Sequence, residues 1–311
     1  MDIYLPIAEM PVSVLVVLAM GGAVGLISGL FGVGGGFLLT PLLIFSGIPP
    51  SVAVASVTPQ IVASSTSGAL AYWRRDGIDF KLAGILIASG GAGALAGAEL
   101  FAVLSSAGQL NLVIAICYTI FLATIGGLTL NEAVRAILRN RAARKKGQAL
   151  APVRRGGAHR WIHKLPLKVR FRRSRLYISV LPVIALGLSI SFLGTLLGIG
   201  GGFIMVPALI YLLKVPTSVV VGTSLVQIVG VMGIATVMHA LASESVDVVL
   251  AFILMIGGVI GAQMGASMGQ AMRGEHLRAL LGLLVLAVGV RFAFGLVVPP
   301  DDLFSVTVIA P

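Results

Sequence analysis

Two glycine-rich motifs are the residues of this sequence whose types and spacing are best suited to holding a ligand. Gly32–Phe37 reads GVGGGF and Gly198–Phe203 reads GIGGGF, and each motif ends a long apolar segment and precedes a short one. Each glycine costs about 1 kcal/mol relative to alanine within a helix, so we expect the helix to break at both motifs. The next helix would then begin with unpaired N–H groups, which together with the helix dipole favour an anion.

Polar side chains in the segments that follow complete a candidate anion site. Gln60 and Gln227 lie at equivalent places after the two motifs, and a buried amide needs hydrogen-bond partners, which an oxyanion provides. The alternatives are an interhelical hydrogen bond for the amides and bonding to the helix backbone for serine and threonine. The candidate substrate-binding residues are Gly34, Gly35, Gly36, Phe37, Thr58, Gln60, Gly200, Gly201, Gly202, Phe203, Thr223, Ser224 and Gln227.

Three ionisable residues within apolar segments are candidates for coupling to a proton or another ion. Histidine is a side chain that can titrate near neutrality and pass a proton, which makes His239 a candidate. Glu99 and Arg291 lie inside apolar segments. An ionisable side chain is costly there and usually has a function, and these two could pair with each other. The alternatives are a structural or interfacial position for His239 and snorkelling to the membrane interface for Glu99 and Arg291.

The glycine motifs have two further explanations, a nucleotide-binding fingerprint and close packing of helices. A fingerprint needs a preceding strand and a βαβ unit around it, whereas these motifs lie between apolar segments. Close packing remains open, because small residues let membrane helices approach each other. The duplication of the motif and the short segment after each copy favour the anion site.

The sequence indicates no metal site, no cofactor and no enzyme. Cys117 is the only cysteine, so an intrachain disulfide and a cysteine-based metal site are excluded. His159 and His163 have the spacing of neighbours on one helix face, but they lie in a basic loop with no acidic ligand nearby. No arrangement of Ser, His and Asp points to nucleophilic catalysis, and we therefore expect no catalytic residue.

The elements that position these residues are membrane helices. The chain is 58% hydrophobic and 11% charged, with a mean hydropathy of +1.06, whereas a soluble domain carries about 25% charged residues. We expect an all-α polytopic membrane protein with about 8–10 transmembrane segments, since a crossing needs about 20 residues. Segments 37–48 and 203–213 are too short and either cross in part or re-enter. The ten apolar segments span approximately 11–31, 37–48, 51–73, 82–104, 110–131, 177–197, 203–213, 217–240, 248–272 and 277–298.

The two halves of the chain are related copies with opposite predicted orientation. A register that matches Gln60 to Gln227 extends over more than 60 residues of each half, with two small shifts. Loop 74–81 carries three basic residues and is predicted to be cytoplasmic, whereas its equivalent, loop 241–247, carries two acids and no base and is predicted to lie outside. Inverted-topology repeats with broken helices are typical of secondary transporters, which bind substrate near the midplane. A duplicated scaffold without transport is the alternative.

The predicted organisation has four parts. Residues 1–131 form the first transmembrane repeat, 132–176 a basic cytoplasmic linker, 177–298 the second repeat and 299–311 a periplasmic tail. The linker holds 15 of the 22 Lys and Arg residues and a single acid, which predicts attraction to anionic lipid. Its few aromatic residues argue against nucleic-acid binding. Both termini are predicted to be periplasmic, and the sequence leaves the oligomeric state open.

The doubled motif resembles the TauE/SafE sulfite exporter family over approximately residues 14–131 and 177–297. The residues that carry the resemblance are Gly29–Phe37, Pro41 and Gln60 in the first repeat and Gly194–Gly202, Pro207, Thr223, Gln227 and His239 in the second. The resemblance implies export of sulfite, a sulfonate or a related organosulfur anion across the bacterial cytoplasmic membrane by alternating access, driven by a proton or sodium gradient. The alternatives are a transporter of another small organic anion, a passive anion channel, and a scaffold whose linker recruits a partner.

Overall fold

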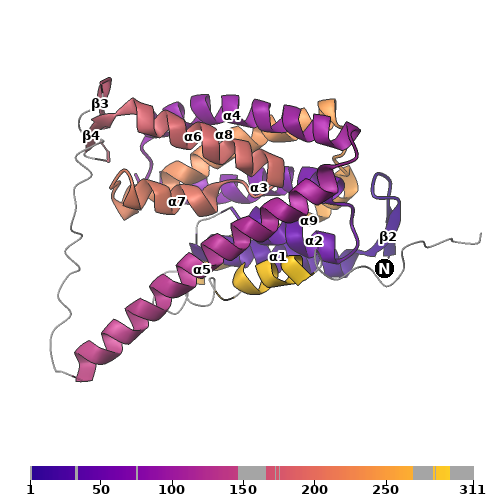
Figure 1. Cartoon of the computed structure of the whole chain (residues 1–311), viewed down its shortest axis with the longest axis horizontal. Helices are drawn as coiled ribbons and strands as arrows, with labels where there is room; N and C mark the ends of the chain where they lie inside the picture. The colour runs from indigo at the N-terminus through magenta and orange to yellow at the C-terminus, as the bar shows by residue number, and fades with distance from the viewer. Residues whose placement is uncertain are drawn as a thin grey trace, which may run out of the picture. The chain divides into compact units, whose positions relative to one another are not determined.

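The computed structural model describes residues 2–31, 34–74, 76–145, 166–171, 173–174, 176–268, 283 and 285–294, and these residues are mostly helical (Figure 1). The helices are α1 (Val14–Phe31), α2 (Gly36–Phe45), α3 (Pro50–Trp73), α4 (Phe80–Ser106), α5 (Leu110–Lys145), α6 (Val180–Leu197), α7 (Gly202–Tyr211), α8 (Thr217–Ala242), α9 (Val248–Met268) and Val285–Phe294. The predicted tail 299–311 and linker residues 146–165, with His159 and His163, lie outside the described residues.

The predicted breaks at both glycine motifs are confirmed. The first interrupts the chain between the end of α1 at Phe31 and the start of α2 at Gly36. The second lies between the end of α6 at Leu197 and the start of α7 at Gly202. Both following helices have 10 residues, and at about 1.5 Å per residue each covers only half of a hydrocarbon core of about 30 Å.

Five helical stretches in the described part of the chain are long and apolar enough to cross a membrane. They are Phe80–Ser106, Leu110–Leu128, Val180–Leu197, Val219–Ala242 and Val248–Gly265. Helix α3 has the length for a crossing, with 24 residues, but its serine, threonine and glutamine residues lower its hydropathy. The expectation of about 8–10 crossings therefore stays a prediction.

The chain divides into two compact units. Unit 1 comprises residues 1–111 and 154–272, and unit 2 comprises residues 112–153 and 273–311. In unit 2, Tyr118 of α5 stacks on Phe292, with ring centroids 5.3 Å apart and an interplanar angle of 8°. Helix α5 continues to Lys145 and so carries helical structure well into the predicted linker.

Unit 1 is built from helix pairs that join one copy of the repeat to the other. Helix α1 packs along α9, and its equivalent α6 packs along α4. The backbones touch at glycines: a side chain added at Gly261 would collide with Gly22, and one added at Gly93 would collide with Leu188. Gly93 and Gly261 are equivalent residues, so close packing explains these glycines in both copies.

The equivalent helices α3 and α8 lie side by side in an antiparallel orientation. Thr236 Oγ1, near the end of α8, donates to Thr58 Oγ1, near the start of α3, over 3.0 Å. At the other end of the pair, a Cβ placed at Gly222 in α8 would lie 2.9 Å from the Tyr72 Cβ in α3. Residue numbers thus rise along one helix and fall along the other, so the copies run in opposite directions at this contact.

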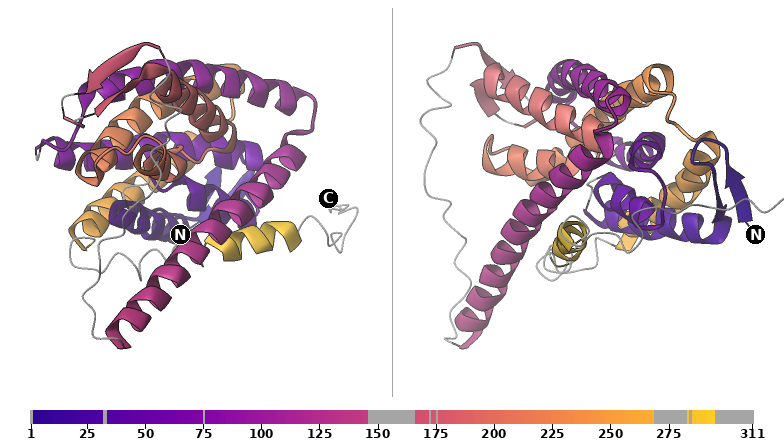
Figure 2. Two further views of the ribbon diagram at one scale, coloured as in Figure 1. Left: turned by 60° about the vertical axis from the view of Figure 1, so that its left-hand side comes forward. Right: turned by 45° about the vertical axis from the view of Figure 1, so that its right-hand side comes forward.

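Two β-hairpins precede the two repeats and are absent from the prediction made from the sequence. Strand β1 (Asp2–Leu5) pairs with β2 (Met10–Ser13), and β3 (Lys168–Phe171) pairs with β4 (Leu176–Ser179). Both pairs are antiparallel and lie at opposite ends of unit 1 (Figure 2). The apolar segments predicted to start near residues 11 and 177 therefore become helical only at Val14 and Val180.

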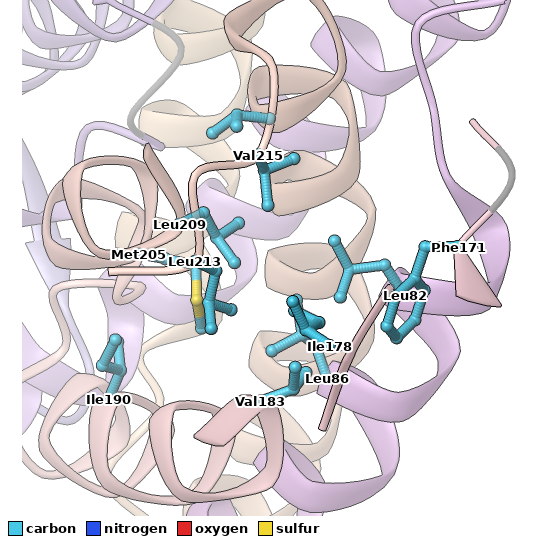
Figure 3. Close-up of a cluster of buried hydrophobic side chains, with 11 residues drawn as sticks. Leu82, Leu86, Phe171, Ile178, Val183, Ile190, Met205, Leu209, Leu213 and Val215 are labelled. Carbon is cyan, nitrogen blue, oxygen red and sulfur yellow. The ribbon is translucent and has the colours of Figure 1, made fainter. Parts of the chain in front are cut away.

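A buried apolar cluster ties the second hairpin to the helices (Figure 3). Phe171 of β3 and Ile178 of β4 are both buried in it. The other members come from α4, α6, α7, the segment after α7 and α8; they are Leu82, Leu86, Val183, Ile190, Met205, Leu209, Leu213, Val215 and Val220. The apolar face of the hairpin is thereby removed from solvent, which explains why so short a strand pair is stable.

Candidate functional site

The backbone at both breaks has a conformation that glycine adopts readily. Gly35 and Gly201 precede α2 and α7, with φ of 73° and 71°. Gly34 and Gly200 also have positive φ, at 87° and 73°. Residues with a Cβ rarely occupy this left-handed region, so the chain direction at each break depends on glycine.

The two breaks converge on one pair of isoleucines. A Cβ placed at Gly34 would lie 3.6 Å from Ile61 Cγ2 and 3.5 Å from Ile228 Cδ1. A Cβ placed at Gly200 would lie 3.0 Å from Ile61 Cγ2 and 3.8 Å from Ile228 Cγ2. Ile61 and Ile228 each follow a candidate glutamine directly. The two motifs therefore border the same buried region, which we call the shared centre. A binding site formed by both copies would require this arrangement.

The first residues with side chains after the two breaks also meet. Phe37 and Phe203 are both buried, and their rings stack with centroids 4.5 Å apart and an interplanar angle of 12°. Thr40 of α2 donates from Oγ1 to the Gly198 carbonyl oxygen over 3.2 Å. The start of α2 is thus held directly against the second break.

Backbone donors remain available at the second break. The N–H groups of Gly200 and Gly201 make no backbone hydrogen bond within the described part of the chain. Both residues are buried, so water does not satisfy these donors freely. A break with buried, unused N–H groups next to a helix start can bind an anion.

The two candidate glutamines differ in how their amides are satisfied. Gln60 is 0% exposed, lies against Gly258 of α9, and has no hydrogen-bond partner among the described residues for either Nε2 or Oε1. Gln227 is equally buried, but its Nε2 donates to Ser191 Oγ over 3.2 Å and only its Oε1 is unpartnered. The equivalent of Ser191 in the first repeat is Gly25, which has no side chain to offer Gln60.

The three candidate hydroxyls make structural hydrogen bonds. Thr58 Oγ1 donates to the Ala55 carbonyl, and Ser224 Oγ donates to the Val221 carbonyl of its own helix. Thr223 Oγ1 donates to the Val219 carbonyl and accepts from the Asp79 N–H over 3.0 Å. These hydroxyls follow the alternative of bonding to the helix backbone.

Ser65 was not among the candidates, yet its hydroxyl is buried and unpartnered next to a break. Its Oγ lies 3.6 Å from a Cβ placed at Gly34, and no residue that the structure describes is a hydrogen-bond partner for it. The sequence offers no signal for it, because Ser65 lies in a run of Ser and Thr and its repeat equivalent is Met232.

His239 is fully buried rather than interfacial. Its Nε2 lies 3.3 Å from the Thr195 carbonyl oxygen, and its ring packs edge-on against Phe101, with centroids 4.5 Å apart. A carbonyl oxygen only accepts, so Nε2 carries the proton and Nδ1 is left as an acceptor in the neutral ring. Nδ1 and the Thr195 Oγ1 are both buried without a partner.

Glu99 and Arg291 lie in different units. Glu99 is exposed on α4 in unit 1 and makes no hydrogen bond or ion pair with another described residue. Arg291 is exposed in the helix Val285–Phe294 of unit 2. Their proposed pairing stays a prediction.

Apolar helices in two copies, broken at buried glycines beside an unpartnered amide, define the class of multi-pass membrane transporters. A family model described as "Sulfite exporter TauE/SafE" matches residues 17–292. The chain belongs to this family, whose members are transporters rather than enzymes.

Individual relatives agree with this assignment. The chain is 28% identical over 288 residues to a "Probable membrane transporter protein" of Xylella fastidiosa, covering 89% of this chain and 94% of the relative. It is 29% identical over 278 residues to the "Probable membrane transporter protein YjnA" of Bacillus subtilis, covering 88% and 98%. A shorter stretch of 54 residues is 44% identical to "Sulfite exporter TauE/SafE family protein 5" of Arabidopsis thaliana, covering 17% and 12%. No solved structure matches the chain.

Proposed function

We propose that this protein is a secondary transporter that exports a small anion, namely sulfite, a sulfonate or a related organosulfur anion, across the bacterial cytoplasmic membrane. The observation that carries the proposal is the convergence of both glycine breaks on Ile61 and Ile228. Two helix starts that share one buried centre provide N–H donors from two sides, and a family of anion exporters supplies the substrate class.

The anion is held by neutral donors. The N–H groups of Gly200 and Gly201, their equivalents in the first repeat and the Gln60 amide bind the oxygens of the substrate. The unpartnered Gln60 supports this role, because a buried amide without a partner lowers stability and is otherwise unexplained. Neutral donors give moderate affinity, which suits a transporter that must also release its substrate.

Alternating access follows from inverted copies. The antiparallel contact between α3 and α8 and the two hairpins at opposite ends of unit 1 support inversion. In this proposal, the basic loop 74–81 is cytoplasmic, and loop 241–247 and both termini are periplasmic. Rocking one copy against the other exposes the shared centre to each side in turn.

In this proposal, the stacked rings of Phe37 and Phe203 act as a barrier at the centre. Access to the centre from either side of the membrane requires these rings to separate. We propose that the short helices α2 and α7 tilt to separate them. We assign coupling to His239, whose buried ring has one unpartnered nitrogen that can accept a proton. Glu99 and Arg291 are the further candidates for ion coupling.

Flux measurements in proteoliposomes test the proposal. Gly35→Leu places a side chain where a Cβ already lies 3.0 Å from the Ser28 Cβ and at positive φ, so we expect loss of labelled sulfite or sulfonate flux. Gly84→Leu is the matched control, because nothing lies within 4 Å of a Cβ at Gly84. Wild-type flux from Gly35→Leu at normal membrane abundance refutes the site.

The same vesicles separate the alternatives. A panel of labelled sulfonates and carboxylates identifies the substrate, and preference for a carboxylate would favour a transporter of another organic anion. A passive channel would give conductance that persists without a coupling gradient and does not saturate. We expect saturable flux that depends on a proton or sodium gradient.

A further inference from the structure

A basic cavity lies where the start of α4 meets the β3–β4 hairpin. Its volume is about 320 Å³, and its lining residues are Ile78, Asp79, Phe80, Lys81, Arg170 and Arg173. Three of these side chains are cationic and one is a carboxylate. The Asp79 carboxylate is already used, because it accepts hydrogen bonds from the Leu82 N–H and from the N–H and hydroxyl of Ser174.

The cations of this cavity are available to an external anion. Lys81 and Arg170 are exposed and make no hydrogen bond or ion pair with any residue that the structure describes. Asp76 orients Arg173 through two contacts. The Arg173 Nη1 donates to the Asp76 carbonyl oxygen over 2.9 Å, and the Arg173 Nη2 forms an ion pair with the Asp76 Oδ1 at 2.9 Å. Its remaining N–H groups are free to reach a second acceptor.

An apolar groove continues from the basic cavity. It has a volume of about 110 Å³ and shares Ile78 and Phe80 with the cavity. The remaining lining residues are Thr66, Ala69, Leu70, Trp73, Val226 and Val229. The Thr66 hydroxyl donates to the Val62 carbonyl of its own helix, so the Trp73 indole N–H is the one other polar group among the described side chains that line the groove.

An aromatic pair marks the junction between cavity and groove. Trp73 and Phe80 are 60% and 57% exposed and lie edge to face, with ring centroids 6.2 Å apart. Exposed aromatic residues of a membrane protein concentrate at the level of the lipid headgroups. A ligand that crosses this junction therefore passes from headgroup depth into the acyl region.

The basic charge is not required by the fold. At the opposite end of unit 1, Tyr4 occupies the place of Arg170. Ile7 is the equivalent of Arg173, and Val249 is the equivalent of Lys81. The β1–β2 hairpin and the start of α9 thus have no cation at these three positions. Only the end predicted to be cytoplasmic carries the cations, and the cytoplasmic leaflet is the one that presents anionic lipid.

We propose that this cavity and groove form a binding site for an anionic phospholipid of the cytoplasmic leaflet. Lys81, Arg170 and Arg173 bind the phosphate, because guanidinium and ammonium groups both suit phosphate oxygens. An acyl chain lies along Leu70 and Trp73 toward α8. The site is separate from the glycine breaks, and its existence does not depend on the transported substrate.

Native mass spectrometry of the detergent-purified full chain tests the site. The probes are phosphatidylglycerol and phosphatidylcholine with the same acyl chains. We expect wild-type protein to retain phosphatidylglycerol preferentially, and the double variant Lys81→Gln/Arg170→Gln to weaken that retention about thirtyfold. Lys168→Gln is the control, because Lys168 is an exposed cation on the same hairpin that does not line the cavity.

A second variant distinguishes a lipid from a free anion. Leu70 is 47% exposed in the groove, so Leu70→Trp fills the acyl path and should also reduce phosphatidylglycerol retention. Leu100→Trp alters an exposed leucine that lines neither cavity nor groove and should leave it unchanged. Unaltered retention by Leu70→Trp together with displacement by inorganic phosphate would assign the cavity to a free anion. Equal retention of both lipids by the wild type overturns the site altogether.

Discussion

Gln60 and Gln227 are equivalent residues whose amides have different neighbours. Ser191 in α6 accepts a hydrogen bond from the Gln227 Nε2, and Gly25 in α1 offers nothing to Gln60. A buried amide that lacks partners costs about 1–3 kcal/mol relative to one that has them. The first repeat therefore carries an uncompensated polar group, which is a reason to assign it to the substrate.

Replacing these amides with the similarly shaped methionine separates the two roles. We expect Gln60→Met to raise the stability of the empty protein by about 1–3 kcal/mol, because it removes an unsatisfied amide, while abolishing flux. Gln227→Met should lower stability by about 1 kcal/mol, because it breaks the bond to Ser191. Thermal unfolding in detergent and proteoliposome flux measure both effects. Equal destabilisation by the two substitutions would mean that Gln60 has a structural partner.

The glycines of the breaks act through backbone conformation. Gly201 has φ of 71°, and a Cβ there would lie 2.9 Å from Ile190 Cγ2. We expect Gly201→Ala to destabilise the protein by at least about 1–2 kcal/mol. Gly84→Ala, within a helix and with open space around it, should instead be neutral or stabilising by up to about 1 kcal/mol. Similar unfolding temperatures for the two variants would contradict a strained backbone at the break.

At the scale of elements, two buried aspartates join helix ends to hairpins. Asp247 Oδ1 accepts from the Leu250 N–H and caps α9, while its Oδ2 accepts from the Ile7 N–H in the β1–β2 hairpin, each over 3.0 Å. Asp79 caps α4 through Leu82 and accepts from Ser174 in the β3–β4 hairpin. Each aspartate thus ties one copy of the repeat to the hairpin of the other.

These links should dominate the stability of the helix ends. We expect Asp247→Ala to cost about 2–4 kcal/mol, since two hydrogen bonds to a charged acceptor are lost. Asp76→Ala is the comparison, because the Asp76 side chain is 78% exposed in its ion pair with Arg173, and such pairs contribute less than about 1 kcal/mol. Denaturation of both variants in the same detergent measures the difference; a small effect at Asp247 would argue against its capping role.

At the scale of the whole molecule, the antiparallel contact between α3 and α8 is the arrangement expected of two copies with opposite orientation. We therefore propose that the basic loop before α4 and the acidic loop before α9 lie on opposite faces of the membrane. The hairpins, which precede α1 and α6, would follow the same inversion. The proposed site shared by both copies would then lie between these faces, where a transporter needs it.

Cysteine labelling tests this topology. In a Cys117→Ala background, which removes the only native cysteine, Lys81→Cys and Glu244→Cys each introduce one thiol at an exposed position. We expect a membrane-impermeant maleimide to modify residue 81 only from the cytoplasmic side and residue 244 only from the periplasmic side. Modification of both from the same side would refute the inverted arrangement.

Local composition was enough to predict several features of this protein. Hydropathy indicates membrane helices, the doubled glycine motif predicts where they break, and the matched register identifies the equivalent residues Gln60 and Gln227. These features are local because helix formation and interruption depend mainly on residues within a few turns. The helices α2 and α7 accordingly begin within one residue of their predicted starts.

The hydrogen-bond partners of the polar groups, in contrast, depend on how distant segments pack together. Thr58 bonds with Thr236, Thr223 accepts from Asp79, and Gln60 has no partner. The two hairpins were not predicted from the sequence. Four-residue strands with mixed polarity show little periodicity, and these strands are stabilised by helices that lie far along the chain. Hydrogen bonds and packing between residues more than a hundred positions apart depend on how the two copies meet, and no local pattern encodes that contact.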